Sequence, residues 1–304
     1  MSIIVQGVSK FYGEQKALNN ITFEVKTGEI VGFIGPNGAG KSTMMKIITG
    51  FMPASSGKVS VNGLAVEEDN TEVKKQIGYL PENNPLYPEM YVREYLGFVA
   101  SIYKTALPVK KQIDNIIDLT GLMPEQNKKI GSLSKGYRQR VGLAQALIHN
   151  PAVLILDEAT TGLDPNQIVE IRNLIKKAGK EKTVMISTHI MQEVEAICNR
   201  VIIIDKGVIV ADEEKSKIYS KIKRPKQVIE VEFDKETTDS SLADIANVSS
   251  IKNIRDNIWL IEAEGDDDIR PDIFNFAVKN NLTVLSLNKQ ESNLEEVFRH
   301  LTNG

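Results

Sequence analysis

The stretch GEIVGFIGPNGAGKSTMMKIITG, residues 28–50, joins an apolar run to a helical pattern through a glycine-rich turn. The apolar run predicts a buried strand, and the pattern after the turn predicts a helix that begins near Lys41 and closes on Gly50. Between them stands G-x-x-x-x-G-K-[ST], whose backbone N–H groups, together with the positive end of the helix, bind phosphate. We expect nucleotide contacts from the whole turn: Gly35, Pro36, Asn37, Gly38, Ala39, Gly40, Lys41, Ser42 and Thr43.

Two side chains of this motif have defined tasks. The Lys41 ammonium reaches the β- and γ-phosphates of a nucleotide, so Lys41 is both a binding and a catalytic candidate. The Ser42 hydroxyl is placed to ligate Mg²⁺. By itself, the motif is compatible with kinases, GTPases and many ATPases.

Polar side chains end two further apolar runs, PAVLILDE (151–158) and TVMISTH (183–189). Both runs predict buried strands, and open α/β sheets bind ligands beyond the carboxyl ends of their strands. Asp157 is therefore expected to hold the metal and its water shell, and Glu158 to orient or deprotonate an attacking water. His189 is a third catalytic candidate at a neighbouring strand end.

Short β-rich runs alternate with helical patterns through most of residues 1–220, which predicts a mainly parallel α/β sheet covered by helices. The run 166–180 predicts a crossover helix that closes on Gly179. Residues 83–150 differ, because their helical patterns have no strand between them, and so predict a helical insertion. The N-terminal MSIIVQGVSKFYG (1–13) predicts an edge strand.

A second, smaller domain is expected at 221–304. A polar and basic stretch containing Pro225 predicts a linker near 215–226. The runs that follow predict the order β-α-β-β-α-β and a final helix, with the first helix at LADIAN (242–247). This order is typical of a small α+β domain of the split-βαβ, ferredoxin-like kind.

Composition narrows the partners of the chain. A net charge of -3 and a pI near 5.8 provide no field for a nucleic-acid backbone, so no nucleic acid is expected as a partner. No run approaches the ~20 apolar residues that cross a bilayer, so a membrane role requires a separate subunit. The single Cys198 predicts a small buried side chain in a reducing compartment. His149 and His300 are expected either to carry favourable charges near helix ends or to lie on the surface.

The stretch LSKGYRQR, residues 133–140, begins a second basic, amphipathic helix that runs to about Asn150. Ser134 and Gly136 lie at its N-terminus, where a hydroxyl, free N–H groups and the helix dipole favour an anion. The alternative is that Ser134 only caps the helix.

Together these motifs resemble those of ATP-binding-cassette (ABC) ATPases over about residues 1–220. GPNGAGKST is similar to the Walker A motif of the family, LSKGYRQR to its signature segment, VLILDEAT to Walker B with the catalytic glutamate, and GLDP to the D-loop. His189 matches the switch histidine. Lys135, Tyr137 and Ala159 depart from the Gly, Gln and Pro of many members.

The resemblance implies a P-loop NTPase of the ABC cassette type, with an antiparallel N-terminal β-subdomain beside the parallel core. It implies ATP and Mg²⁺ as cofactors, and a head-to-tail homodimer that sandwiches two ATP. Ser134 and Gly136 would serve the partner's γ-phosphate, and Asp164 of the D-loop joins the nucleotide contacts. Tyr12 would stack on adenine, a role that core packing could imitate. The resemblance also implies an integral-membrane subunit as a separate chain, with this chain cytoplasmic and peripheral on the inner face of the cell membrane.

Glu82 stands where the family has a glutamine, before the helical insertion. A carboxylate ~5 Å from a γ-phosphate charge would cost about 3 kcal/mol per unit charge at an effective dielectric of about 20. We therefore expect Glu82 to face Mg²⁺ or its water, as a metal and nucleotide contact. The following NPLYPEMYVREYL (84–96) resembles the surface that contacts the membrane subunit, and core packing is the alternative for its aromatic residues.

Several runs, among them HIMQEVEA, are similar to the ABC-2-type exporter group and most of all to its gliding-motility-associated members. We therefore expect an ATP-hydrolysing subunit that drives export through ATP-dependent dimerisation. The alternatives are a soluble ABC ATPase that acts on ribosomes or DNA, and a nucleotide-gated module with negligible hydrolysis. The presence of Glu158 and His189 favours hydrolysis over the second alternative.

Overall fold

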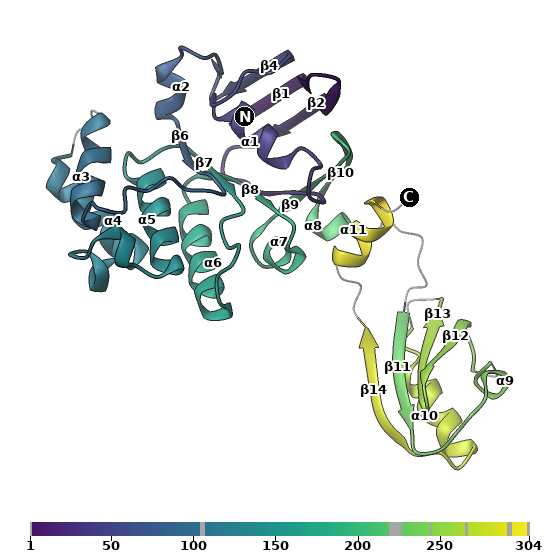
Figure 1. Ribbon diagram of the computed structural model, residues 1–304. Coiled ribbons are helices and arrows are strands. Elements are labelled where there is room, and N and C mark those ends of the chain that lie inside the picture. Colours follow the sequence, from purple (N-terminus) through teal and green to yellow (C-terminus); the bar gives the residue numbers. More distant parts are fainter. Residues whose placement is uncertain are drawn as a thin grey trace. The chain divides into compact units, whose positions relative to one another are not determined.

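The computed structural model describes residues 2–103, 107–218, 227–243, 245–264, 267–290 and 294–302, except the side chains of residues 290, 296 and 300. The chain forms two compact units, Met1–Ile218 with Phe298–Gly304, and Tyr219–Val297 (Figure 1). The sequence places all of 221–304 in the second domain, whereas the last residues group with the first unit. Of the expected linker, Lys215–Ile218 form the short helix α8 and the remainder lies outside the described residues.

The core of the first unit is a six-stranded sheet in the order β10-β9-β3-β8-β7-β6. All neighbouring strands pair in parallel except β9 and β10. The central strands are buried throughout because helices cover both faces, which explains their continuous apolar sequences. The strands are β3 (Ile30–Ile34), β6 (Ile77–Leu80), β7 (Val153–Asp157), β8 (Thr183–Thr188), β9 (Arg200–Asp205) and β10 (Val208–Glu214).

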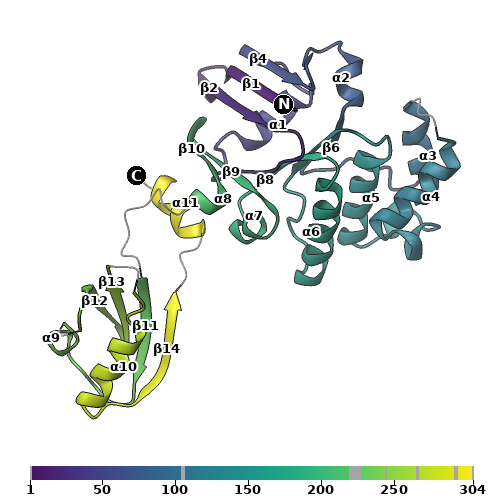
Figure 2. The ribbon, with the colours of Figure 1, turned by 180° about the vertical axis from the view of Figure 1, so that it is seen from behind.

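Helices lie on both sides of this sheet. In the two opposite views, α5, α6 and α7 lie on one side and α1 on the other (Figures 1 and 2). The predicted crossover helix is confirmed as α6, which ends at Gly179. The bounds are α1 (Lys41–Ile48), α5 (Lys135–Leu147), α6 (Pro165–Gly179) and α7 (Met191–Ile197).

The register of the parallel strands determines where the site lies. Ile34 at the end of β3 pairs with Thr188 at the end of β8, and Asp157 at the end of β7 pairs with Ser187. The carboxyl ends of these strands therefore share one edge of the sheet, the edge at which the glycine-rich turn leaves β3.

An antiparallel sheet in the order β2-β1-β4-β5 forms the N-terminal part. The sequence predicts an edge strand for the N-terminus, and this is wrong, because β1 pairs on both sides, with β2 and with β4. The buried side chains of the antiparallel sheet belong to the same core cluster as those of α1 and the six-stranded sheet. The bounds are β1 (Ile3–Tyr12), β2 (Gln15–Val25), β4 (Ser56–Val61) and β5 (Leu64–Ala65), and the short helix α2 (Thr71–Lys75) follows.

The predicted helical insertion is confirmed. Between residues 83 and 150, the described residues form α3 (Val92–Ile102), α4 (Val109–Thr120), two 3₁₀ turns at Met123–Glu125 and Ile130–Ser132, and α5, with no strand among them. Gly121 ends α4 in the left-handed conformation, the usual reason for glycine at this position. None of the helices in the described part of the chain is both long and apolar enough to cross a membrane.

The second unit has the predicted β-α-β-β-α-β order. Its sheet is antiparallel in the order β12-β13-β11-β14, so β13 separates the two strands of the first βαβ unit. The helix expected at 242–247 is misplaced, because Thr238 caps a helix that ends at Leu242. The bounds are β11 (Gln227–Phe233), α9 (Asp239–Leu242), β12 (Val248–Arg255), β13 (Ile258–Ala263), α10 (Arg270–Lys279) and β14 (Val284–Gln290), and α11 (Leu294–Thr302) closes the chain.

Substitution by alanine is expected to have opposite effects on stability at Gly78, in β6, and at Gly97, in the helical insertion. A Cβ at Gly78 in β6 would lie 2.1 Å from the carbonyl oxygen of Ala146 in α5, whereas a Cβ at Gly97 in α3 would lie 3.5 Å from Ile113. We expect Gly78→Ala to lower the free energy of unfolding by about 1–3 kcal/mol, because α5 must move. Gly97→Ala is expected to raise it by up to about 1 kcal/mol through helix propensity. Urea unfolding checks both, and equal midpoints for the two variants would contradict the close approach of α5.

Candidate functional site

The glycine-rich turn between β3 and α1 has a backbone that other residues would not adopt without strain. Gly38 and Gly40 have φ of 81° and 110°, in the left-handed region. A Cβ at Gly40 would lie 2.7 Å from the carbonyl oxygen of Ala17, and one at Gly35 only 2.3 Å from that of Ile204. The turn is therefore packed against neighbouring backbone on these sides, which fixes its shape around the start of α1.

Lys41 is enclosed by this turn. Its side chain is 6% exposed, and Nζ donates to the carbonyl oxygens of Gly35 at 2.8 Å and Pro36 at 3.2 Å. Burial lowers the pKa of Lys41, while the charges of Glu158, Asp157 and Glu82 act in the opposite direction. The ammonium thus lies within the curve of the turn, among carboxylates that favour its charged form.

Asp157, at the end of β7, is buried and accepts two hydroxyl hydrogen bonds. Ser42 Oγ donates to Asp157 Oδ1 at 3.1 Å, and Ser187 Oγ donates to the same oxygen. A hydroxyl and a carboxylate side by side are oxygen ligands of the kind that Mg²⁺ prefers, usually together with phosphate oxygens. The residues at this position therefore fit a magnesium ion bound with a nucleotide.

Glu158 is the most constrained residue of the site. It has a φ of 52°, a left-handed conformation that is uncommon for residues other than glycine, asparagine and aspartate. Its carboxylate lies 2.9 and 3.0 Å from His189 Nδ1, accepts from Thr161 Oγ1 at 2.9 Å, and lies 3.9 Å from Lys41 Nζ. Its N–H donates to the carbonyl oxygen of Ser187 at 3.0 Å, which ties it to β8. The carboxylate is held in one place beside the turn.

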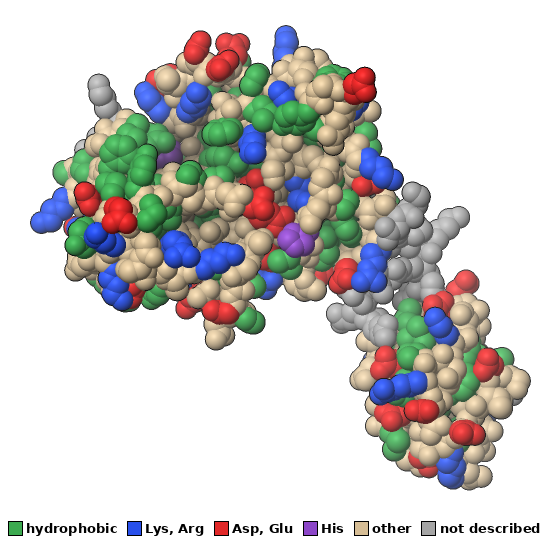
Figure 3. Space-filling view, in the orientation of Figure 1, with side chains coloured by type: hydrophobic (Ala, Val, Ile, Leu, Met, Phe, Trp, Pro, Cys, Tyr) green, Lys and Arg blue, Asp and Glu red, His purple; other side chains and the backbone are tan. Residues whose placement is uncertain are grey.

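The structure thus brings together Lys41, Ser42, Asp157, Glu158 and His189, as the sequence predicts for one site. Acidic, basic and histidine side chains lie close together near the centre of one face of the first unit (Figure 3). Sequence reasoning missed Ser187 and Thr161, whose hydroxyls hold Asp157 and Glu158. The sequence contained a signal for both residues, because Thr161 closely follows the apolar run 151–158 and Ser187 lies at the polar end of the run 183–189.

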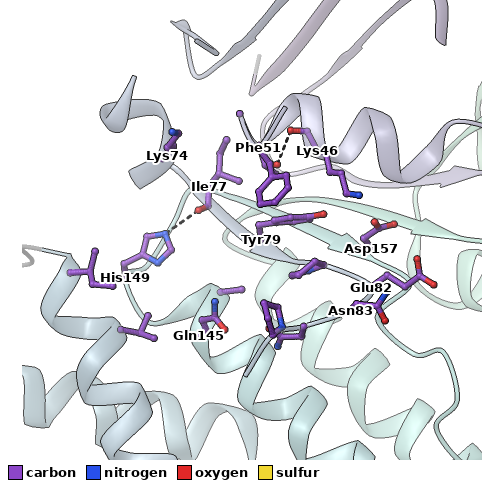
Figure 4. A pocket seen from close by; sticks show the side chains of 18 of the residues that line it. Lys46, Phe51, Lys74, Ile77, Tyr79, Glu82, Asn83, Gln145, His149 and Asp157 are labelled. Carbon is purple, nitrogen blue, oxygen red and sulfur yellow. Dashed lines mark hydrogen bonds between the residues drawn. The ribbon is translucent and has the colours of Figure 1, made fainter. Parts of the chain in front are cut away.

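Glu82 lines a cavity of about 650 Å³ together with Ser42 and Asp157 (Figure 4). Tyr79 lines the same cavity, and its buried hydroxyl has no hydrogen-bond partner among the described residues. Burial raises the pKa of Tyr79, and the charges of Asp157 and Glu82 raise it further. Glu82 therefore lies within electrostatic reach of the magnesium ligands, and its orientation toward the metal stays a prediction.

The signature segment packs against the D-loop and the start of α6. Ser134 caps α5 by accepting from the N–H of Tyr137 at 3.3 Å, and Asp164 caps α6 by accepting from the N–H of Gln167 at 2.9 Å. A Cβ at Gly136 would lie 2.5 Å from the side chain of Gln167. The capping alternative for Ser134 is thus realised, and nucleotide binding by these residues stays a prediction.

Tyr12 lies at the end of β1 with 45% of its side chain exposed. Lys10 Nζ lies 5.7 Å from the centre of the ring, and the Tyr12 hydroxyl donates to Met52 Sδ at 3.0 Å. Core packing is therefore not the role of this ring. Stacking on adenine stays a prediction.

His149 corrects an expectation. The sequence predicts a favourable charge or a surface residue, but burial lowers the pKa of His149 to about 4, so the ring is neutral at pH 7. It stacks on Tyr103 with ring centres 4.0 Å apart, and Nε2 lies 3.2 Å from the carbonyl oxygen of Ile77 (Figure 4). The side chain of His300, the other histidine outside the site, lies outside the described residues. Cys198 is buried as predicted.

The chain is similar to known proteins. Residues 18–161 match the model of the family described as "ABC transporter". The linearmycin resistance ATP-binding protein of Bacillus subtilis is 32% identical over 303 residues, which cover 98% of this chain and 97% of that protein. The Nod factor export ATP-binding protein I of Burkholderia orbicola is 35% identical over 212 residues, 68% of this chain and 69% of that protein.

A solved structure of a dimeric ATP-binding cassette, in a post-hydrolysis state bound to ADP and Pi, is similar to the first unit. The match has a TM-score of 0.64 and 29% identity, and it covers 70% of this chain and 98% of that one.

The enclosed position of Lys41 predicts a selective loss of nucleotide affinity. We expect Lys41→Met to weaken ATP binding by about 100-fold, because a charged group that contacts several phosphate oxygens is lost. The matched control is Lys111→Met, which removes an exposed lysine of α4 away from the turn. Titration with a fluorescent ATP analogue measures both affinities, and an equal loss in both variants would contradict the assignment of Lys41.

Proposed function

Because the chain belongs to the ABC transporter family, we propose that it drives export by closing on ATP as a head-to-tail homodimer and opening after hydrolysis. It is an ATP-binding subunit of an ABC transporter and hydrolyses ATP. The observation that carries the proposal is the Glu158 carboxylate, which His189, Thr161 and Lys41 hold beside the phosphate-binding turn.

The roles follow from these positions. The turn and Lys41 bind the phosphates, and Ser42 and Asp157 would hold Mg²⁺, which supplies positive charge toward the phosphate oxygens when bound. Glu158 orients or deprotonates the attacking water, because its carboxylate is held beside the turn and, unlike that of Asp157, is not a proposed metal ligand. His189 is hydrogen-bonded to Glu158 and contacts the γ-phosphate. Tyr12 stacks on adenine, and Glu82 faces the metal or its water.

The second copy completes each nucleotide site. Ser134 and Gly136 bind the γ-phosphate held by the partner, and Asp164 joins them from the D-loop. Support comes from the packing of the signature segment against the D-loop, since a Cβ at Gly162 would lie 2.0 Å from Lys135 Nζ. Gln139 Nε2 also donates at 2.7 Å to the carbonyl oxygen of Ala159, the residue after Glu158. One rigid surface therefore carries the groups offered to the other copy, and two-fold symmetry makes both sites equal.

A separate integral-membrane subunit docks into the cavity of Figure 4, which we name the aromatic groove. Phe51, Tyr87 and Phe98 line it with 74%, 53% and 47% of their side chains exposed. Tyr95, by contrast, is buried and holds Tyr87 edge-to-face at 5.9 Å, so the aromatic residues of this region divide between core and surface. Exposed aromatic residues around a concave surface are typical of a protein-binding site.

This partner would place the chain at the inner, cytoplasmic face of the cell membrane, with no nucleic acid involved. Within the ABC-2-type exporters, the resemblance of several runs favours a gliding-motility-associated transporter. The alternatives are a soluble ABC ATPase without a membrane subunit and a nucleotide-gated module with negligible hydrolysis. Co-purification with a membrane protein separates the first alternative from our proposal, and a phosphate-release assay separates the second.

Glu158→Gln is expected to keep ATP binding and to reduce turnover by about 100-fold or more, because an amide cannot deprotonate water. The variant should accumulate as an ATP-bound dimer, since hydrolysis no longer opens it. Phosphate release measures turnover, and size-exclusion chromatography with light scattering measures the dimer. The matched control is Glu181→Gln, an exposed glutamate that should behave as wild type. Unchanged turnover in Glu158→Gln would remove Glu158 from the mechanism.

The double variant Tyr87→Ser/Phe98→Ser is expected to lose its membrane subunit. The two rings contact each other edge-to-face, with centres 6.1 Å apart, and form much of the exposed apolar rim of the aromatic groove. Affinity purification from detergent-solubilised membranes measures the co-purifying subunit. Phe274→Ser, which removes an exposed ring from the second unit, is the control. Retention of the subunit by the double variant would move docking away from the groove.

A further inference from the structure

A second buried glutamate lies near Glu158 and His189, which we call the catalytic pair, and has no part in the mechanism above. Glu193, in α7, is 2% exposed. Its Oε1 accepts a hydrogen bond from Thr160 Oγ1, and its Oε2 accepts one from Thr188 Oγ1 at 2.9 Å. Both threonines are buried as well. One carboxylate therefore links the loop after β7 to the end of β8.

The two threonines flank the catalytic pair in the sequence. Thr160 is two residues after Glu158, and Thr188 immediately precedes His189. Thr188 Oγ1 also accepts from the N–H of Ile190 at 3.0 Å, so the backbone on both sides of His189 depends on this threonine. Because the Glu193 carboxylate binds the segments that carry Glu158 and His189, it constrains the distance between these two side chains.

Stability of the fold alone does not explain a carboxylate at this position, because burying its charge costs desolvation energy. Burial raises the pKa of Glu193, and the charge of Glu158 raises it further, while the Thr188 hydrogen bond and the charge of Arg172 lower it. Replacing a buried charge by a well-packed apolar group is often neutral or stabilising. A buried carboxylate between two active-site segments therefore indicates a constraint other than stability.

We propose that Glu193 is a positioning residue for ATP hydrolysis, whose carboxylate, held by Thr160 and Thr188, keeps Glu158 and His189 in the geometry that the reaction needs. The proposal rests on the roles given above to Glu158 and His189. Glu193 acts through these residues and does not contact the nucleotide. It should therefore affect turnover and leave ATP affinity unchanged, since the phosphate-binding turn lies outside its contacts.

The kinetic test uses the full-length protein with Glu193→Gln, which keeps the shape of the side chain but loses its charge and one acceptor oxygen. We expect kcat to fall by about 10-fold or more and the ATP affinity to stay within about twofold, as for other residues that orient a catalytic group. Thr188→Val, which removes one of the two hydroxyl donors, should show the same division. Glu181→Gln, which changes the exposed glutamate after α6, is the matched control and should resemble wild type.

A spectroscopic test separates positioning from simple stability. The chain has three histidines, so the ring signals in a ¹³C-histidine NMR spectrum are few, and His189→Gln assigns that of His189. Glu193→Gln and Thr188→Val are expected to shift the His189 signal and to leave the other two in place. A loss of thermal stability alone would not produce this pattern.

The outcomes distinguish a failure of the role of Glu193 from a failure of the proposed hydrolysis mechanism. Wild-type kcat and an unshifted His189 signal in a folded Glu193→Gln protein would overturn the role of Glu193, even where Glu158→Gln is inactive. Equal losses of kcat and ATP affinity would also overturn it, because they indicate a general disturbance of the site. Full activity of Glu158→Gln would instead overturn the underlying mechanism.

Discussion

The parallel pairing of β3 with β8 and of β8 with β7 is the constraint on which the site depends. It places the ends of three strands, at Ile34, Asp157 and Thr188, along one edge of the sheet. The phosphate-binding turn follows Ile34, Glu158 follows Asp157, and His189 follows Thr188. Because all three strands are fully buried, the edge is as rigid as the core, and side chains far apart in the sequence meet at fixed distances.

The charges around the turn support the proposal that a second copy of the chain completes the site. Around the turn, the charge of Lys41 faces those of Asp157, Glu158 and Glu82. A triphosphate brought to this excess of negative charge would be repelled unless further positive groups approached it. In the proposed function, Mg²⁺ at Ser42 and Asp157 would provide one such group, and the helix end at Ser134 of a second copy would provide another. The same electrostatic imbalance would make the proposed closed dimer depend on bound nucleotide.

The sequence predicted the parts of the site that local motifs encode, and it failed where tertiary contacts decide. The turn at Gly35–Ser42 and the strand ends at Asp157 and His189 follow from patterns of a few residues, and the helical insertion follows from periodicity. Pairing partners carry no local signal, so β1 was misread as an edge strand. For the same reason, the buried ring of His149 and the threonine contacts of Glu193 became visible only in the fold, since each depends on residues distant in the sequence.

The aromatic groove is lined in part by residues proposed to contact the metal, and this gives coupling a physical basis. Glu82 and Asp157 line one part, while His149 lines another (Figure 4). Tyr79 lies between them, with a buried hydroxyl that has no partner among the described residues and with Asp157 and Glu82 as its charged neighbours. A segment that fills the groove would change the solvation of Asp157 and Glu82, the carboxylates proposed to contact the metal. In the proposed function, the state of the nucleotide and the fit of a docked segment would therefore be linked through shared side chains, and such a link acts equally in both directions.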